Sequence, residues 1–97
     1  MEFDWDEKKN QSNFTNHGIR FEEAKTIFDS PVYTWTDTRV DYGELREISI
    51  GMFRQSTGVV VVHTDRNGVT RPISARKASR KERQAYHGYL EKTFNRD

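Results

Sequence analysis

The chain has 97 residues, of which 33% are hydrophobic, so it is long enough for one modest hydrophobic core. It contains no cysteine, which excludes disulfides and thiol chemistry, and no apolar run long enough for a signal peptide or a membrane span, which favours a cytoplasmic protein. The formal net charge of +1 conceals an asymmetry, because residues 66–97 hold nine cations and three acids whereas residues 1–65 hold seven cations and twelve acids.

The N-terminal segment predicts a short strand followed by a polar helix. Phe3–Trp5 is expected to form the strand. Asp4 or Asp6 can cap a helix that runs to about His17, and Gly18 follows as a left-handed stop. This helix is unusually polar, since it holds a single large apolar side chain.

A second helix and another strand follow. A helix over Phe21–Phe28 is predicted because its apolar residues recur in one stripe, and Asp29–Pro31 ends it. Val32–Trp35 is β-branched and aromatic, which predicts a strand. Thr36–Gly43 has the composition of a polar loop.

The middle of the chain predicts two paired strands. Glu44–Arg54 alternates, which places Arg46 on the face of the apolar residues at positions 48, 50 and 52. Gln55–Gly58 is expected to form a hairpin turn. Val59–Asp65 is the most apolar strand and is therefore predicted to be central.

The last third predicts a final strand and a terminal helix. Arg66–Gly68 carries the Asn-Gly hairpin signal, and Val69–Arg76 returns as the strand. Pro72 has no N–H, which favours an edge position or a bulge there. Ser79–Glu82 fits a capping box that starts a helix running to about Lys92. The predicted buried stripe of this helix is Ala85, Tyr86, Tyr89 and Leu90.

These elements follow the order β-α-α-β-β-β-β-α, which predicts one α+β domain over residues 1–97. The expected architecture is an antiparallel β-sheet meander with the two N-terminal helices packed on one face and the C-terminal helix beside it. A meander covered on one face leaves its second face free to display polar side chains.

Arginines around the start of the terminal helix predict a phosphate-binding site. If Ile73 and Ala75 face the core, strand alternation turns Ser74 and Arg76 outward. Arg80 and Arg83 lie one helical turn apart, so Arg76, Arg80 and Arg83 can converge on one phosphate beside the helix N-terminus. The alternative is a solvated basic face, because a cluster of positive charges indicates attraction to anions but does not by itself indicate catalysis.

Histidine is the side chain best suited to proton transfer near neutral pH. His63 ends the apolar strand near Arg71 and is a candidate general base, with a packed neutral histidine as the alternative. His17 lies in the last turn of the polar helix, where an interaction with the helix dipole is the alternative to catalysis. Glu82 is interpreted as the capping-box acid rather than a general base, and His87 as a surface residue.

The inventory of the chain suits one kind of enzyme. It holds no nucleophile triad, Gly-rich phosphate loop or metal-ligand spacing, so neither a metal nor a cofactor is expected. Metal-independent RNA cleavage fits, because RNA supplies its own nucleophile, the 2′-hydroxyl, and the protein needs to position it, take a proton and neutralise charge. The predicted catalytic residues are Arg76, Arg80, Arg83, Arg46, His63 and His17, and the predicted RNA contacts are Arg71, Lys77, Lys81 and Tyr86.

Segments along nearly the whole chain match a known family in order and spacing. They are Phe3–Asp6 with Lys8, Asn13, Asn16–Ile19, Phe21–Ala24, Phe28–Asp29, Glu44–Arg46, Ile50–Gly51, Val61–Thr64 and Ile73–Arg83 with Tyr86. On these segments the chain resembles the BrnT family of toxins from bacterial type II toxin–antitoxin pairs. One position departs from the pattern, because Asn16 stands where members often have lysine, and a phosphate contact by that lysine is absent here.

The resemblance implies a RelE-like fold and a ribonuclease that cleaves RNA, with ribosome-bound message among its candidate substrates, and so arrests translation. It also implies neutralisation by a small BrnA-like antitoxin with a ribbon-helix-helix DNA-binding dimer. The expected 2:2 complex binds operator DNA through the antitoxin and represses its own operon. An acidic segment of the antitoxin would cover the surface formed by the basic residues that bind RNA.

Two other classes of function stay open. A non-catalytic toxin-like subunit would act as a co-repressor with its partner and show salt-dependent binding without cleavage. A translation factor that blocks the ribosome without cutting would arrest growth while messenger RNA stays intact.

Overall fold

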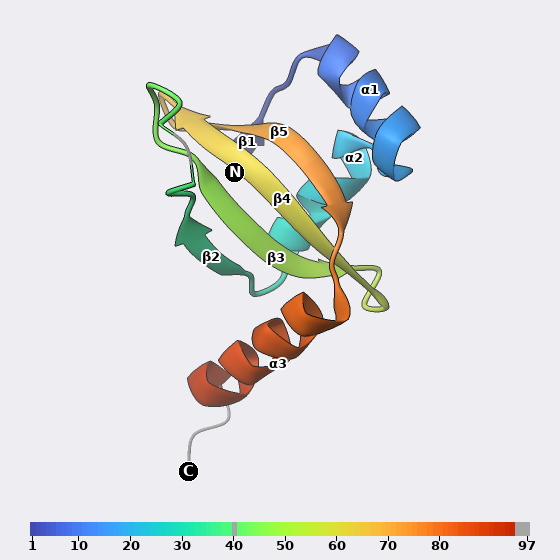
Figure 1. Ribbon diagram of the computed structural model, residues 1–97, viewed down its shortest axis with the longest axis vertical. Coiled ribbons are helices and arrows are strands. Elements are labelled where there is room, and N and C mark those ends of the chain that lie inside the picture. The colour runs from blue at the N-terminus through green and yellow to red at the C-terminus, as the bar shows by residue number, and fades with distance from the viewer. Residues whose placement is uncertain (40, 95–97) are drawn as a thin grey trace.

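The computed structural model describes residues 1–39 and 41–94, which form a five-stranded sheet, three α-helices and one 3-10 helix (Figure 1). In chain order the elements are β1 (Glu2–Phe3), α1 (Glu7–His17), α2 (Phe21–Ala24), the 3-10 helix η1 (Lys25–Asp29), β2 (Tyr33–Thr36), β3 (Glu47–Phe53), β4 (Thr57–Arg66), β5 (Val69–Lys77) and α3 (Arg80–Phe94). The predicted α+β class is confirmed.

The strands lie in the order β1-β5-β4-β3-β2 across the sheet. Strands β2 to β5 pair antiparallel with their neighbours, as the predicted meander requires, but β1 pairs parallel to β5. The prediction of a wholly antiparallel meander is therefore wrong for β1. Most of the chain separates these two strands, so no hairpin dictates their relative direction.

A bulge interrupts the pairing of β5 with β4 at the proline. Val62 of β4 pairs with Ser74, but the next β4 residue, His63, pairs with Pro72. Ile73 is therefore the extra residue of the bulge. The bulge accommodates the missing N–H of Pro72, as the sequence predicts. It also inverts the alternation, so Arg71 lies on the same face of the strand as Arg76, whereas strict alternation had placed them on opposite faces.

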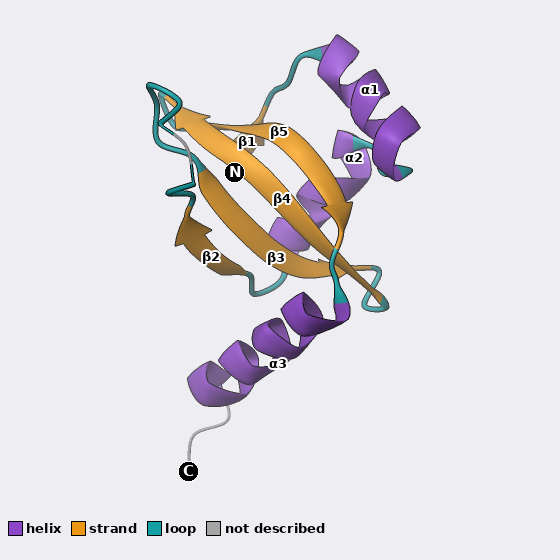
Figure 2. Cartoon of the chain, viewed as in Figure 1, coloured by secondary structure: helices purple, strands orange, loops and turns teal. Residues whose placement is uncertain are grey.

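The strands carry apolar side chains on both faces of the sheet. One buried cluster contains Ile19, Phe21, Ala24, Ile27, Val59, Val61 and Ala75. The other contains Ile48, Ile50, Val60, Ala78 and Tyr86. Because consecutive β4 residues alternate between the clusters, α2 and η1 cover one face while α3 packs over one end of the opposite face (Figure 2). The second face is therefore not free along its whole length, because α3 and an apolar cluster occupy one end of it.

The predicted second helix forms as two shorter pieces. One α-helical turn, α2, is followed by the 3-10 helix η1, which ends at Asp29. The predicted stripe is nevertheless largely buried, since Phe21, Ala24 and Ile27 are 0% exposed and Phe28 is half-buried. A 3-10 segment is a common way to tighten a helix end, and here the chain must turn extended before Pro31.

Polar side chains attach α1 to the sheet. The amide nitrogen of Asn13 donates to the carbonyl oxygens of Ala75 (2.8 Å) and Ile19 (2.9 Å), and its oxygen accepts from the Ala75 N–H (2.9 Å). Within residues 1–39 and 41–94, no strand pairs with this edge of β5 beyond Thr70. Asn13 therefore supplies the hydrogen bonds that a neighbouring strand would make.

Asn10 connects α1 to α2 in the same manner. Its oxygen accepts from the N–H of Phe21 (2.8 Å), and its nitrogen donates to carboxylate oxygens of Glu22 (2.7 Å) and Glu7 (3.2 Å). The Phe21 N–H lies in the first turn of α2, where the helix itself provides no acceptor. The buried side chains of Asn10 and Asn13 thus attach α1 to the rest of the fold in place of an apolar stripe. Phe14, the large apolar residue of α1, stays 40% exposed.

The start of α3 lies directly against β4. The N–H of Ala78 donates to the carbonyl oxygen of Gly58 (2.8 Å). A Cβ atom on Gly58 would stand 2.9 Å from Cγ of Arg83, so this close approach needs a glycine. Further along α3, the buried Tyr86 donates its hydroxyl hydrogen to the carbonyl oxygen of Pro31 (2.7 Å). These contacts fix the helix on the sheet.

The substitution Asn13→Ala is expected to lower the free energy of unfolding by about 3 kcal/mol. It leaves the buried N–H and C=O of Ala75 without partners, and each such group costs roughly 1–3 kcal/mol. Urea denaturation measures the change. The control Asn16→Ala removes an exposed asparagine of the same helix and should shift stability by less than about 0.5 kcal/mol. Equal effects of the two substitutions would contradict the anchoring role.

Candidate functional site

An open cleft of about 290 Å³ lies on the face of the sheet that α3 covers only at one end. Its lining residues are Trp35, Arg39, Ile48, Val60, Val62, Ser74, Arg76 and Glu82, and we call it the Arg76 cleft. The floor is made by apolar residues of β3 and β4, and the polar groups stand on the rim. Ser74 and Arg76 face outward from the core, in the direction that strand alternation predicts.

Arg76 and Glu82 form a two-point ion pair at one wall of the cleft. Nη1 and Nη2 of Arg76 donate to Oε1 and Oε2 of Glu82 at 2.8 and 2.7 Å. Glu82 Oε1 also accepts from the Ser79 N–H (2.8 Å), and the Glu82 N–H donates to Ser79 Oγ (3.2 Å). The predicted capping box is therefore present. The Arg76 hydrogen bonds, helped by those from Ser79, lower the pKa of Glu82 to about 2, so its carboxylate is ionised at neutral pH.

A second ion pair stands across the cleft, in the segment after β2. Nε and Nη2 of Arg39 donate to the two carboxylate oxygens of Asp37 at 2.8 and 2.9 Å. The Asp37 side chain is buried, whereas that of Arg39 is 64% exposed. The Arg39 hydrogen bond is the main cause that lowers the pKa of Asp37 to about 2, with the charge of Arg46 as a smaller one. The buried Asp37 carboxylate thus holds the guanidinium of Arg39 in place at the cleft.

Arg46, the predicted assisting residue, lies beside this second pair. It precedes β3 instead of lying in it, and its carbonyl oxygen accepts from the Asp37 N–H (2.8 Å). Its guanidinium stacks 3.7 Å over the ring of Tyr42 and approaches Glu44 to 3.7 Å. The Nε atom of Arg46 is buried and has no hydrogen-bond partner among the described residues. The structure therefore links Arg46 to the cleft through Asp37 and Arg39.

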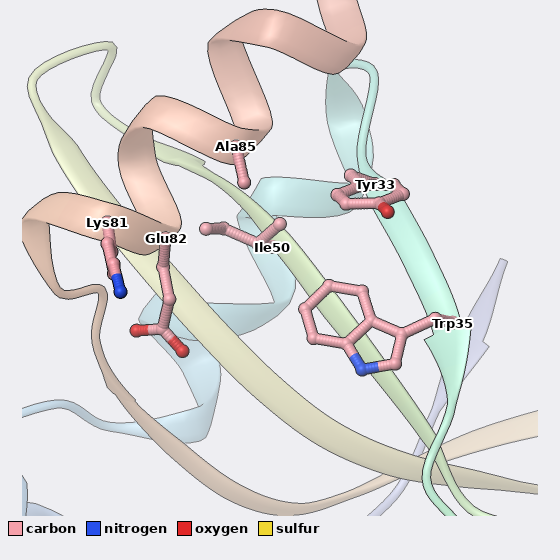
Figure 3. Close-up of a pocket in the computed structure, with 6 residues that line it drawn as sticks. All are labelled: Tyr33, Trp35, Ile50, Lys81, Glu82 and Ala85. Atoms are coloured by element: carbon pink, nitrogen blue, oxygen red, sulfur yellow. The ribbon is translucent and has the colours of Figure 1, made fainter.

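An apolar pocket of about 650 Å³ adjoins the Arg76 cleft and shares Trp35 and Glu82 with it. Its remaining lining residues are Tyr33, Ile50, Lys81 and Ala85, and we call it the Trp35 pocket. Figure 3 shows Tyr33 and Trp35 on β2 across from the α3 residues, with Ile50 between them. The Tyr33 ring stacks on Tyr89 (4.6 Å) and lies 5.1 Å from the indole of Trp35, which gives a row of three aromatic rings.

The structure does not bring the predicted arginine triad to one point. The Arg83 side chain packs against Gly58, near the turn between β3 and β4. Successive residues turn about 100° around a helix, so Arg83 leaves α3 on a different side from Glu82. Neither Arg83 nor Arg80 lines the cleft or the pocket, whereas Lys81, a predicted RNA contact, lines the pocket.

His63 is packed on the opposite face of the sheet. It is 5% exposed, its ring meets the Phe28 ring edge-on at 5.3 Å, and its Nε2 shares a hydrogen bond with Ser49 Oγ (2.7 Å). Burial lowers the pKa of His63 below its ordinary 6.5, so the ring is neutral at neutral pH. These contacts match the alternative of a packed neutral histidine, and the ring lies away from the Arg76 cleft.

The remaining candidates are dispersed. His17 is exposed in the last turn of α1, directly before the left-handed stop with φ of 72°. Arg71 is paired with Asp4 at 2.9 Å, and Lys77 is exposed at the end of β5. Tyr86 is 3% exposed and its hydroxyl is engaged within the protein, which is the packing role that its helix stripe predicts.

Sequence reasoning did not single out Trp35, Asp37 or Arg39. A usable signal existed for the first, because Tyr33 and Trp35 occupy alternate positions of a predicted strand and hence one face of it. Aromatic residues on a sheet face are a recurrent platform for RNA bases. Asp37 and Arg39 fell in the predicted polar loop, where an ion pair two residues apart has no sequence signature.

Over residues 1–39 and 41–94, no three His, Asp or Glu side chains gather as a group that could hold a metal ion. No helix in that part of the chain combines the length and apolar character needed to cross a membrane.

Comparisons with known proteins agree on one family. The family model described as the ribonuclease toxin, BrnT, of type II toxin–antitoxin systems matches residues 5–82. Among solved structures, the chain is similar to the crystal structure of the ribonuclease toxin BrnT from Brucella abortus, with 28% sequence identity and a TM-score of 0.63. That similarity covers 82% of this chain and 99% of the Brucella chain. No match was found among curated proteins.

The substitution Glu82→Gln is expected to flatten the response of stability to acid. The folded-state pKa of Glu82, about 2, lies below its ordinary 4.5, so the ionised carboxylate stabilises the fold above pH 4.5 and this contribution is lost as the pH falls toward 2. Urea titrations between these pH values should show a steeper loss for the wild type than for the variant. The control Glu91→Gln, at an exposed position of the same helix, should keep the wild-type slope. Identical slopes for the wild type and Glu82→Gln would argue against the ion pair in solution.

Proposed function

The chain belongs to the BrnT family of ribonuclease toxins of type II toxin–antitoxin systems, and from this premise we propose that it is a metal-independent endoribonuclease acting in the Arg76 cleft. The proposal places a single RelE-like domain over residues 1–97. The observation that carries it is the outward-facing Arg76 guanidinium in an open cleft, beside an exposed Arg39 and the aromatic row of the Trp35 pocket.

The proposed reaction uses the nucleophile of the RNA itself. The 2′-oxygen loses its proton and attacks the adjacent phosphorus, the bond to the 5′-oxygen breaks, and this oxygen takes a proton from water, so the products are a 2′,3′-cyclic phosphate and a 5′-hydroxyl. Negative charge accumulates on the non-bridging oxygens during this step. A planar guanidinium such as that of Arg76 matches those oxygens with two parallel donors and stabilises the charge.

Glu82 is the group in the cleft best placed to take the proton of the 2′-hydroxyl. Its low pKa depends first on the hydrogen bonds from Arg76. When phosphate oxygens replace the carboxylate on that guanidinium, this cause is removed and the pKa of Glu82 rises, which makes it a better base. His63 and His17 do not line the cleft, and in this scheme His63 holds the strands together through Ser49.

The proposal assigns binding of the RNA, and not the chemical step, to Arg80, Arg83, Lys77 and Arg71. They lie outside the cleft, where cations can hold the flanking phosphates of a longer RNA without touching the reacting one. Replacing such a residue weakens binding for all sequences and lowers the salt dependence, but it does not selectively slow the chemical step.

A type II family implies a protein antitoxin as partner. The proposal identifies it as a BrnA-like ribbon-helix-helix protein that forms a 2:2 complex in the cytoplasm and represses the shared operon through operator DNA. Arg76 and the exposed Arg39 support neutralisation by an acidic segment of that antitoxin, because carboxylates of such a segment can replace those of Glu82 and Asp37 on the two guanidinium groups. A short neighbouring reading frame for a ribbon-helix-helix protein is the simplest check.

Arg76→Ala is expected to reduce the rate of RNA cleavage by roughly 100- to 1000-fold, as loss of one charge-stabilising donor does in other enzymes. The purified wild type should cut RNA in EDTA and leave 2′,3′-cyclic phosphate ends. Stability should change by less than about 1 kcal/mol, because the ion pair of Arg76 is partly exposed.

The matched control is Arg66→Ala, which also removes an exposed, ion-paired arginine but lies outside the cleft. It should retain nearly full cleavage. Equal losses of activity and stability in Arg76→Ala would return Arg76 to a structural role. Salt-dependent binding without cleavage, with and without ribosomes, would replace the enzyme by the non-catalytic co-repressor.

A further inference from the structure

We propose that the Trp35 pocket binds one unpaired nucleobase, which makes single-stranded RNA the substrate class of the cleft. This inference rests on the proposed cleavage at Arg76. The base leaves its own stack and places one face against the Trp35 indole while its phosphate reaches the guanidinium of Arg76. Stacking of splayed-out bases on aromatic side chains is how proteins commonly hold single strands.

The aromatic row offers a free position at one end. Tyr33 is stacked on Tyr89 with the ring planes 18° apart, so one of its faces is occupied within the protein. Trp35 is the last ring of the row, inclined by 47° to Tyr33, and it remains 36% exposed. The indole therefore has aromatic surface available to a ligand, and its neighbours hold its orientation.

The pocket suits a flat apolar ligand. Its volume of about 650 Å³ falls in the range of roughly 300–1000 Å³ typical of small-molecule sites. Ile50 lies between the β2 aromatics and α3, and the small side chain of Ala85 faces the pocket from α3, across from Tyr33 (Figure 3). Lys81 and Glu82 add polar groups along α3 that can meet the hydrogen-bonding edge of a base.

The position of the pocket relative to the cleft ties base and phosphate together. Glu82 lines both cavities and is bonded to Arg76, so the two sites adjoin at that side chain. Lys81 and Arg39 are the other cations on the rims. Cations around an aromatic pocket favour a ligand that carries both phosphates and flat rings, and an apolar peptide side chain satisfies only half of this arrangement.

Duplex RNA does not meet the requirement. In a helix each base is stacked on both faces and paired along its edge, so its stacking and pairing must be broken before any contact with the indole forms. An unpaired base offers its face without this penalty. The pocket therefore discriminates against duplexes even though they carry the same phosphates.

Tryptophan fluorescence tests the stacking directly and without reference to cleavage. The chain has two tryptophans, so Trp5→Phe leaves Trp35 as the sole reporter. The probe is a single strand in which every 2′-hydroxyl is methylated, which removes the nucleophile, and the comparisons are an abasic strand of equal charge and a duplex. We expect quenching of Trp35 by the first and little change with the other two.

Substitutions at the pocket supply the second measurement. Trp35→Ala is expected to weaken binding of the methylated single strand by roughly 10- to 100-fold, whereas Trp35→Phe stays within about threefold because it keeps a stacking ring. Binding of the abasic strand should change little in either variant. The control Leu45→Ala removes another exposed apolar side chain, outside the pocket, and should bind as the wild type.

The outcomes separate this inference from the proposed function. Equal quenching and affinity for normal and abasic strands overturn the base site even if the protein cuts RNA. Base-dependent quenching by a protein that never cuts RNA supports the base site and removes the nuclease. If Trp35→Ala abolishes binding of the antitoxin but leaves binding of the single strand intact, the pocket holds a protein side chain and the inference is wrong.

Discussion

Beyond Thr70, the outer edge of β5 faces no strand among the described residues, and the amide of Asn13 takes the place of one. Buried N–H and C=O groups at such an edge must find partners, so this contact determines where β5 can lie. With Ala75 held and turned into the core, the next residue, Arg76, faces the opposite side and enters the cleft. The arginine of the proposed chemistry is thus positioned by an asparagine that lies 62 residues before Ala75 in the chain.

Glu82 connects the fold to the site from the other side. The same carboxylate closes the capping box with Ser79 and holds both terminal nitrogens of Arg76, so the start of α3 and the wall of the cleft form one unit. This pairing lowers the positive charge that Arg76 offers to a ligand. A phosphate must replace the carboxylate, which favours ligands that match the guanidinium with two oxygens over loosely held ions.

Local signals in the sequence predicted structure wherever one residue type decides the backbone. The capping box at Ser79–Glu82, the bulge at Pro72 and the left-handed stop at Gly18 are all present. The direction of β1 and the polar docking of α1 could not be predicted, because both depend on contacts with β5, far along the chain. The candidate site likewise has one part that the sequence could predict and one that it could not. Alternation predicted the outward direction of Arg76, but the neighbourhood of Trp35 depends on how β2 pairs with β3 and faces α3.

The charge asymmetry of the chain acquires a different meaning in three dimensions. Asp37, from the acidic part, and Glu82, from the basic part, each bind an arginine of the same cleft, so the two guanidinium groups are locally compensated. A site that relied on phosphate attraction alone would need uncompensated cations, and it would bind every nucleic acid alike. Among the residues that line the cleft, Trp35 is the one that offers an aromatic ring. Since single strands and duplexes carry the same phosphates and differ in whether base faces are accessible, selectivity in such a site must come from stacking rather than from charge.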